Sequence, residues 1–164
     1  LHRGRHRLSE VVEAAVQPLR AAAAQKKVAI RLQVRDDEVD LDAEEVGIAI
    51  RNLVGNALKY ASDGGLVTVK ASRSSGDAVF EVSDRGPGIH ESELRLIFDR
   101  YYRSTAGAAE LVPGSGLGLY IVRRIADLHG GTATVENMPG GGARFTIRIP
   151  PTAGGGAIGA EGQS

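Results

Sequence analysis

The sequence contains no cysteine, carries no net charge and has no long apolar run. Without cysteine the chain can form no disulfide, offers no thiolate nucleophile and cannot build the common zinc sites. Its 20 basic residues are balanced by 20 acidic residues, which argues against a nucleic-acid binder that works by neutralising phosphates. No apolar stretch approaches the roughly 18 residues that a membrane-spanning helix needs, and no signal peptide is recognisable.

What is present is typical of one soluble globular domain. The chain has 164 residues, of which 42% are hydrophobic and 24% charged, and a domain of this size can bury a core without covalent staples. Residues 1–7 (LHRGRHR) are basic and begin without Met, so we interpret the chain as a fragment of a longer protein. Residues 151–164 are rich in Gly and Ala and are predicted to form a disordered C-terminal tail.

Hydrophobic periodicity predicts helices and hairpins between these ends. Helical spacing is present in residues 8–23, interrupted by Pro18, and in 42–61, 91–98 and 117–129; alternation typical of strands is present in 28–34, 66–72, 78–83, 132–137 and 143–149. Helices and antiparallel hairpins that alternate in blocks favour a two-layer α/β sandwich, with helices on one sheet. Residues 99–115 show no clear period, and so long a loop in a compact domain is usually functional or mobile.

A glycine-rich loop, Gly114-Ser115-Gly116-Leu117-Gly118, opens the last predicted helix. The free N–H groups of a helix start attract anions, phosphate above all, and glycine lets the backbone approach a ligand closely. The loop is not a Walker A motif, since no lysine occurs after Lys70, and it is not a Rossmann fingerprint, since position 119 is Leu. By itself it is equally compatible with a glycine-rich turn that binds nothing.

A second cluster spans residues 84–89 (DRGPGI), where a carboxylate follows a predicted strand and precedes two glycines. Asp84 could accept a hydrogen bond from the exocyclic amine of a nucleotide base. A plain turn is the commoner explanation of such a sequence taken alone, because Asp and Gly are frequent turn residues.

A third cluster lies on the second predicted helix, where Asn52, Asn56, Lys59 and Tyr60 are spaced to share one face. Carboxamide oxygens suit a hard cation such as Mg²⁺, which keeps waters and bridges to substrate phosphates. A lysine can add a point charge to the same phosphates. The alternative is an exposed polar stripe, since the other side of the helix is apolar.

Taken together, the clusters resemble the ATP-binding catalytic domain of sensor histidine kinases, in the wider group that includes gyrase B, Hsp90 and MutL. The resemblance extends from about residue 8 to Pro150. Residues 52–60 match the N box of that family, 84–89 its first glycine box, 98–103 its F box and 114–119 its second glycine box. It implies a Bergerat-type α/β sandwich, in which a mixed, largely antiparallel sheet packs on helices.

The resemblance also implies roles for individual residues. Asp84 would hydrogen-bond the adenine amino group, and Gly86 and Gly88 would let the backbone close on the base and ribose. Asn56 would ligate Mg²⁺, with Asn52 beside it as a ligand or orienting residue. The remaining implied residues are Lys59 and Tyr60 at the phosphates, Gly114, Gly116, Leu117 and Gly118 at the nucleotide, and Arg103 at the γ-phosphate, with Arg100 a weaker candidate because Asp99 could hold it. Residues 99–115 would form a lid, hinged at Gly114, Gly116 and Gly118.

Asn52 favours one activity within the group. The hydrolysing members carry Glu at this position as the base that activates water, whereas Asn cannot accept a proton at neutral pH. The implied function is therefore that of a protein histidine kinase, which binds Mg²⁺ and ATP and transfers the γ-phosphate to a histidine on a dimerisation domain absent from this chain. Residues 1–7 would be a linker or the end of that domain's last helix, and residues 8–150 the catalytic domain.

The implied partners are that phosphoacceptor domain of the same parent and a response regulator. The resemblance also implies a monomeric fragment of a homodimeric parent, on the cytoplasmic side of a cell in which many such kinases are membrane-anchored. The four histidines are His2, His6, His90 and His129, and none has the family's acceptor sequence. Two alternatives are a catalytically degenerate, regulatory nucleotide-binding module and an ATPase of the same superfamily.

Overall fold

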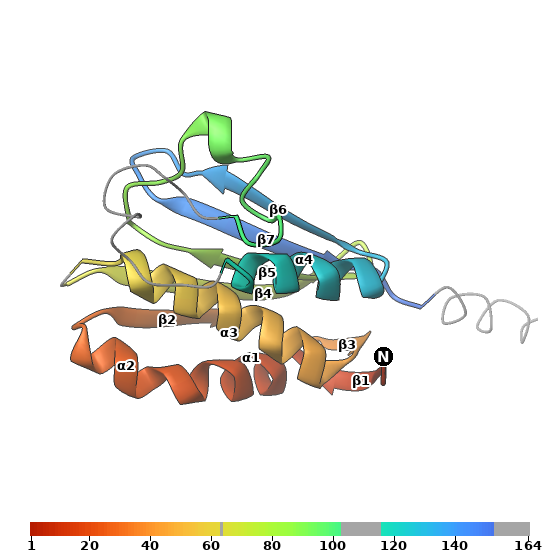
Figure 1. The fold of residues 1–164 in the computed structure, drawn as a ribbon. Helices are drawn as coiled ribbons and strands as arrows, with labels where there is room; N and C mark the ends of the chain where they lie inside the picture. Colours follow the sequence, from red (N-terminus) through yellow and green to blue (C-terminus); the bar gives the residue numbers. More distant parts are fainter. Residues whose placement is uncertain (63, 103–115, 153–164) are drawn as a thin grey trace, which may run out of the picture.

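The computed structural model of the chain describes residues 1–62, 64–102 and 116–152. Helices cover one face of a five-stranded sheet, and a two-stranded sheet lies at one end of the molecule (Figure 1). The elements are β1 (Gly4–Arg7), α1 (Leu8–Val16), η1 (Gln17–Leu19), α2 (Arg20–Gln25), β2 (Ala29–Val34), β3 (Glu38–Leu41), α3 (Ala43–Tyr60), β4 (Leu66–Ser74), β5 (Asp77–Ser83), η2 (Glu91–Glu93), α4 (Gly118–Leu128), β6 (Thr132–Asn137) and β7 (Ala143–Ile149).

The large sheet has the strand order β2-β4-β5-β7-β6. β2 pairs with β4 in parallel, and the remaining neighbours are antiparallel. The hairpins β4–β5 and β6–β7 were both predicted, and the bounds of β6 and β7 agree with the alternation in the sequence. The predicted fold class, a mixed and largely antiparallel sheet packed on helices, is confirmed.

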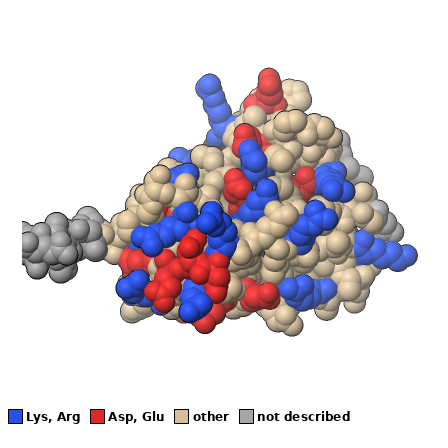
Figure 2. Space-filling model, turned by 180° about the vertical axis from the view of Figure 1, so that it is seen from behind, with Lys and Arg blue, Asp and Glu red and all other residues tan. Residues whose placement is uncertain are grey.

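The core lies between the sheet and helices α1, α3 and α4. Side chains that alternate along β4, β5 and β7 point toward these helices and are buried: Val67, Val69, Ala71, Phe80, Val82, Phe145, Ile147 and Ile149. Strands that bury every second residue in this way leave a polar face on the other side of the sheet. Figure 2 shows basic and acidic side chains spread over the side of the molecule away from the helices.

The first seven residues differ from the expected linker or helix end. Gly4–Arg7 forms β1, which pairs antiparallel with β3. One ion pair joins the two strands, with an N–O distance of 3.0 Å from Arg5 to Glu38, and another joins Arg7 to Asp36, just before β3, at 2.9 Å. Leu8 follows directly and is fully buried, so this segment is part of the domain.

Strand β3 was not among the predicted strands either, and it lies in an acidic stretch of the sequence. Val39 and Leu41 alternate with acidic residues and are buried, while Asp42 caps the next helix. Acidic and basic side chains gather over β1 and β3 (Figure 2). The pattern is that of a short edge pair whose charges neutralise each other.

Two predicted helices are shorter in the structure. Pro18 breaks the first into α1, η1 and α2, as expected for a residue without a backbone N–H. The predicted helix at 91–98 is reduced to η2 and a series of turns. The expected disordered tail lies, from residue 153 onward, outside the described residues. None of the helices in the described ranges is both long and apolar enough to cross a membrane.

Candidate active site

Helix α3 is fixed at both ends. The side chain of Asp42 accepts a hydrogen bond from the backbone N–H of Glu45 at 3.1 Å, which caps the helix start. At the other end, the ammonium group of Lys26 donates to the carbonyls of Leu58 and Lys59, which have no partner within the helix. The last turn, which carries two of the predicted site residues, is therefore held from α2.

The polar face of α3 is exposed as the spacing predicted. Asn52 and Asn56 are half-buried, whereas Lys59 and Tyr60 are exposed. Nδ2 of Asn52 donates to the carbonyl of Ile48 at 3.1 Å, so the amide nitrogen is turned toward its own helix. The four side chains thus lie along one face that the apolar core does not use.

Helix α4 begins next to this face. A β-carbon on Gly118 would lie 3.4 Å from Oδ1 of Asn52, tighter than most contacts between side chains. The second glycine box therefore lets the start of α4 approach the N box closely. Figure 1 shows α3 and α4 side by side on the same face of the sheet.

The first glycine box follows β5. Oδ1 of Asp84 accepts hydrogen bonds from the N–H groups of Gly86, at 2.8 Å, and Ala143, at 3.2 Å. Within the described residues these bonds occupy only one carboxylate oxygen of Asp84. The backbone of this loop also lies near the end of α3, because a β-carbon on Gly86 would be 3.7 Å from the carbonyl oxygen of Tyr60.

Sequence reasoning missed two residues that hold this loop. A β-carbon on Gly142, whose φ is +90°, would lie 2.0 Å from the carbonyl oxygen of Asp84, so no side chain fits there. Asn137 bonds the backbone of Ile89 through both atoms of its side-chain amide. The run of glycines at 140–142 was a signal for a tight turn, but nothing local indicated its contact with residues some sixty positions earlier.

The F box and the second glycine box meet at their backbones. The N–H of Tyr101 donates to the carbonyl of Gly116 at 3.0 Å, and a β-carbon on Gly116 would lie 2.6 Å from the carbonyl carbon of Tyr101. Gly116 has a φ of +74°, which glycine adopts without strain. Two other predicted site residues, Arg103 and Gly114, lie outside the described residues, as does most of the expected lid.

Arg100 is held differently from the prediction. Its guanidinium lies 4.8 Å from the ring centre of Tyr101 and 5.9 Å from that of Tyr120, and it donates to the Tyr101 hydroxyl at 3.0 Å. These contacts, rather than one with Asp99, orient it. They link the F box to α4 by cation–π interactions.

Tyr102 is anchored by a buried carboxylate. Its hydroxyl donates to Oε1 of Glu93 at 2.7 Å, and Glu93 is only 9% exposed. Burial, this hydrogen bond and the charge of Glu93 raise the pKa of Tyr102 to about 12. The phenol therefore keeps its proton and remains a donor at neutral pH.

Two of the four histidines have local structural contacts. Nδ1 of His90 accepts a hydrogen bond from the N–H of Ser92 at the start of η2. His129 is buried at the end of α4. No group of side chains within the described ranges could hold a metal by histidine and carboxylate ligands alone.

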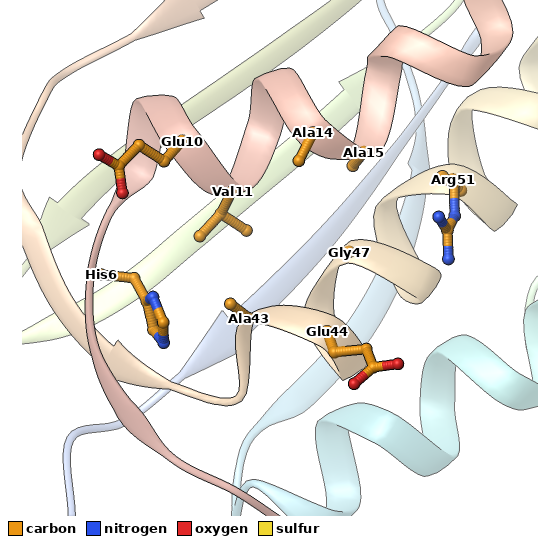
Figure 3. A pocket seen from close by; sticks show the side chains of 9 residues that line it. All are labelled: His6, Glu10, Val11, Ala14, Ala15, Ala43, Glu44, Gly47 and Arg51. Carbon is orange, nitrogen blue, oxygen red and sulfur yellow. The ribbon is translucent and has the colours of Figure 1, made fainter.

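Two hollows open on the surface that the described residues form. One, of about 260 Å³, opens between α1, α3 and β1; Figure 3 shows small side chains along it, with His6 and Glu10 on one side and Glu44 and Arg51 on α3. Another, of about 350 Å³, lies between α4 and the segment that contains Arg100. The second hollow is lined by Phe98, Asp99 and Arg100 of the F box, whereas neither is lined by the asparagines of α3 or by Asp84.

Comparison with known families assigns this arrangement. The model of the histidine kinase-, DNA gyrase B-, and HSP90-like ATPase family matches residues 41–153, from the end of β3 to the last described strand and beyond. The chain belongs to this family. The resemblance inferred from the N box and the two glycine boxes is therefore confirmed, and the domain is an ATP-binding domain of the histidine kinase type.

Individual relatives support the same assignment. The signal transduction histidine-protein kinase AfsQ2 of Streptomyces coelicolor is 44% identical over 124 residues, which are 70% of this chain and 23% of AfsQ2. The histidine protein kinase DivJ of Caulobacter vibrioides is 36% identical over 152 residues, 92% of this chain and 25% of DivJ. The chain thus spans about a quarter of the length of these relatives.

Solved structures have the same fold. The mycobacterial sensor histidine kinase MprB superposes with a TM-score of 0.77 at 29% identity, covering 92% of this chain and 100% of that one. Full-length ShkA in complex with AMPPNP gives a TM-score of 0.79 at 26% identity, covering 92% of this chain and 31% of ShkA.

Proposed function

We propose that this chain is the catalytic domain of a two-component sensor histidine kinase, which binds ATP with Mg²⁺ and transfers the γ-phosphate to a histidine of its parent. The observation that carries the proposal is the meeting of three motifs: the polar face of α3, the loop after β5 and the start of α4. Tyr60 lies beside Gly86, and Asn52 beside Gly118. A base and a polyphosphate can therefore be bound along the same helix.

The base would bind at Asp84. Two N–H groups hold Oδ1 of its carboxylate, so the side chain is oriented before any ligand arrives. Such a carboxylate accepts a hydrogen bond from the exocyclic amine of adenine, whereas guanine has a carbonyl at the same position. Gly86 and Gly88 would allow the backbone to approach the base closely.

The phosphates would bind at the other end of the cluster. Asn56, with Asn52 beside it, offers carboxamide oxygens that fit Mg²⁺, an ion usually held by a few protein oxygens and by substrate phosphates. When bound, Mg²⁺ would neutralise charge on the phosphates. Lys59 would add a point charge, and Tyr60 would support the same end of the site.

The start of α4 would complete the phosphate site. Gly116, Leu117 and Gly118, with Gly114 before them, would present backbone N–H groups and the positive end of the helix dipole to the anion. We assign Arg103 to the γ-phosphate, where a guanidinium stabilises the charge of the transferred group. Arg100 is engaged by two tyrosines, so we do not give it this role.

Phosphoryl transfer fits the site better than hydrolysis. Asn52 has no basic group to activate water, and its amide nitrogen already donates to Ile48. The acceptor would be a histidine on the dimerisation domain of the parent, and a response regulator would take the phosphate from there. In this proposal the isolated domain is monomeric, whereas the parent kinase is a homodimer whose catalytic domain faces the cytoplasm.

Calorimetric titration with ATP, with and without Mg²⁺, tests nucleotide binding. We expect saturable binding that Mg²⁺ strengthens and that Asp84→Asn weakens, since the amide can present a donor to the adenine amine. Ligand at 100 times its dissociation constant should also stabilise the fold by about 2.7 kcal/mol. Asp77→Asn, on the hairpin turn far from the motifs, is the matched control. Absence of binding by the unaltered chain would contradict the proposal.

A phosphotransfer assay separates the kinase from its two alternatives. The chain alone should neither label itself nor release phosphate steadily, whereas it should label an added dimerisation domain of the parent with the γ-phosphate of ATP. Steady phosphate release by the chain alone would indicate an ATPase. Nucleotide binding without transfer would indicate a regulatory module.

A further inference from the structure

The loop of residues 84–89 is attached at both ends to one pair of facing residues in the β6–β7 hairpin. At its start, the N–H of Asp84 donates to the carbonyl of Ala143 at 3.0 Å. At its end, Ile89 bonds to Asn137. Asn137 and Ala143 are register partners in the sheet. The loop therefore leaves the sheet and returns to it at neighbouring points, although it is separated from the hairpin by more than forty residues.

The contact of Asn137 with Ile89 uses both groups of the side-chain amide. The N–H of Ile89 donates to Oδ1 at 2.7 Å, and Nδ2 donates to the carbonyl of Ile89 at 2.6 Å. This is the donor and acceptor pair that a neighbouring strand would supply. An ionised aspartate has no donor, and a serine has its donor and acceptor on a single oxygen, so neither reproduces a pair made by two separate atoms.

Gly88 packs directly against the same amide. Its φ is +79°, and a β-carbon there would lie 2.9 Å from Oδ1 of Asn137 and 3.5 Å from the carbonyl oxygen of Gly142. The left-handed backbone and the closeness of Asn137 thus both favour glycine at this position, besides any ligand. The side chain of Asn137 and the backbones of Gly88 and Gly142 thus lie close together at the end of the loop.

We propose that Asn137 is a positioning residue for nucleotide binding. It fixes the far end of the loop, so that Asp84 and the two glycines of the loop are held in one arrangement for binding the base. The inference rests on the proposed function, because the loop is the base-binding element there. Asn137 acts through Ile89 and Gly88 and does not touch the nucleotide. Its carboxamide therefore tunes base affinity and base selectivity rather than the binding of phosphates.

The test compares Asn137→Ala and Asn137→Asp with Thr134→Ala, a control at an exposed position of the same strand. Affinities for ATP, adenosine and GTP are measured well below the melting temperature of each variant. For Asn137→Ala we expect ATP and adenosine to bind more weakly by the same factor, about three- to tenfold, and the preference for ATP over GTP to fall. Thr134→Ala should match the unaltered chain.

Amide hydrogen exchange gives a readout that needs no nucleotide. In Asn137→Ala, the N–H groups of Ile89 and Gly86 should exchange at least about tenfold faster, since the loop end is released. Asn137→Asp should still protect the N–H of Ile89, because the carboxylate remains an acceptor, yet its affinity for adenosine should fall because the carbonyl of Ile89 faces a second acceptor.

The outcomes separate this inference from the proposed function. The positioning role would be overturned by unchanged amide exchange at Ile89 and Gly86 in Asn137→Ala. It would also be overturned if Asn137→Ala were less stable but kept its affinity for adenosine and its preference for ATP over GTP. Failure of the unaltered chain to bind ATP would overturn both the role of Asn137 in nucleotide binding and the proposed function; faster exchange in Asn137→Ala would then show a purely structural clamp.

Discussion

Nε2 of His129, at the end of α4, accepts a hydrogen bond from the backbone N–H of Asp42, at the start of α3, over 3.1 Å. The other ring nitrogen lies 2.8 Å from the carbonyl of Ile125, to which it donates as the neutral tautomer. Both His129 and Asp42 are buried. The pair joins the two helices that carry the N box and the second glycine box.

Replacement of His129 by leucine should therefore destabilise the domain. Leucine fills the site with an apolar side chain but leaves the buried N–H of Asp42 without its partner, which costs about 1–3 kcal/mol. Urea unfolding measures this loss. His2→Ala is the control, because His2 contributes only its backbone N–H to Asp42 and should change stability by less than about 0.5 kcal/mol. Equal stability of the two variants would contradict the role of His129.

Stability should fall in acid through Asp42. Burial raises the pKa of this carboxyl, but hydrogen bonds from backbone N–H groups, chiefly those of His2 and Glu45, outweigh it, so the pKa lies below its ordinary value of 3.8. A carboxyl whose pKa is lowered by folding stabilises the fold above its unfolded pKa and ceases to do so as the pH falls through its folded pKa.

We accordingly expect the melting temperature to decline below about pH 4. Asp42→Asn should weaken this decline while retaining the helix cap, because Asn is also a good capping residue. Asp36 and Asp40 should retain part of the decline in acid. Their pKa values are also lowered, first by a hydrogen bond from Ser9 to Asp36 and by one from Thr152 to Asp40. An identical acid profile in Asp42→Asn would show that Asp42 does not contribute.

Gly116→Ala should disrupt the junction between the F box and α4. The left-handed backbone at Gly116 and the backbone of Tyr101, 2.6 Å from the new β-carbon, both oppose a side chain. We expect a loss of more than about 1 kcal/mol in unfolding free energy, together with weaker ATP binding. Gly47→Ala, in the middle of α3 with open space around it, should instead stabilise by up to about 1 kcal/mol. Wild-type behaviour of Gly116→Ala would refute the close contact.

Tyr102→Phe should lower stability with little change in shape. The substitution keeps the ring and removes the hydrogen bond to the buried carboxylate of Glu93, at a cost of about 1–3 kcal/mol. Chemical denaturation of the variant gives this value. In the variant Glu93→Gln the hydroxyl of Tyr102 retains an acceptor, so the loss of unfolding free energy should be smaller than in Tyr102→Phe. A larger loss in Glu93→Gln would mean that the charge of Glu93 matters more than its bond to Tyr102.

Local sequence patterns were sufficient for most elements. The alternation at 132–137 and 143–149 gave β6 and β7, and the helical spacing at 42–61 gave α3, because one buried face leaves its period in the sequence. β1 and β3 were missed because they are short, charged and stabilised by each other. A pairing between residues thirty or more positions apart leaves no local period.

The same division holds for the candidate site. Sequence reasoning alone predicted which residues bind a nucleotide: the asparagines and lysine on one face of α3, the carboxylate of Asp84 and the glycines before α4, since residue type and spacing are enough to define a helix face and a glycine-rich loop. How these residues are held is visible only in the tertiary structure. Asn137 reaches Ile89, Gly142 passes against Asp84 and His129 joins α4 to α3 because the chain brings distant segments together, and these contacts depend on packing rather than on any local pattern.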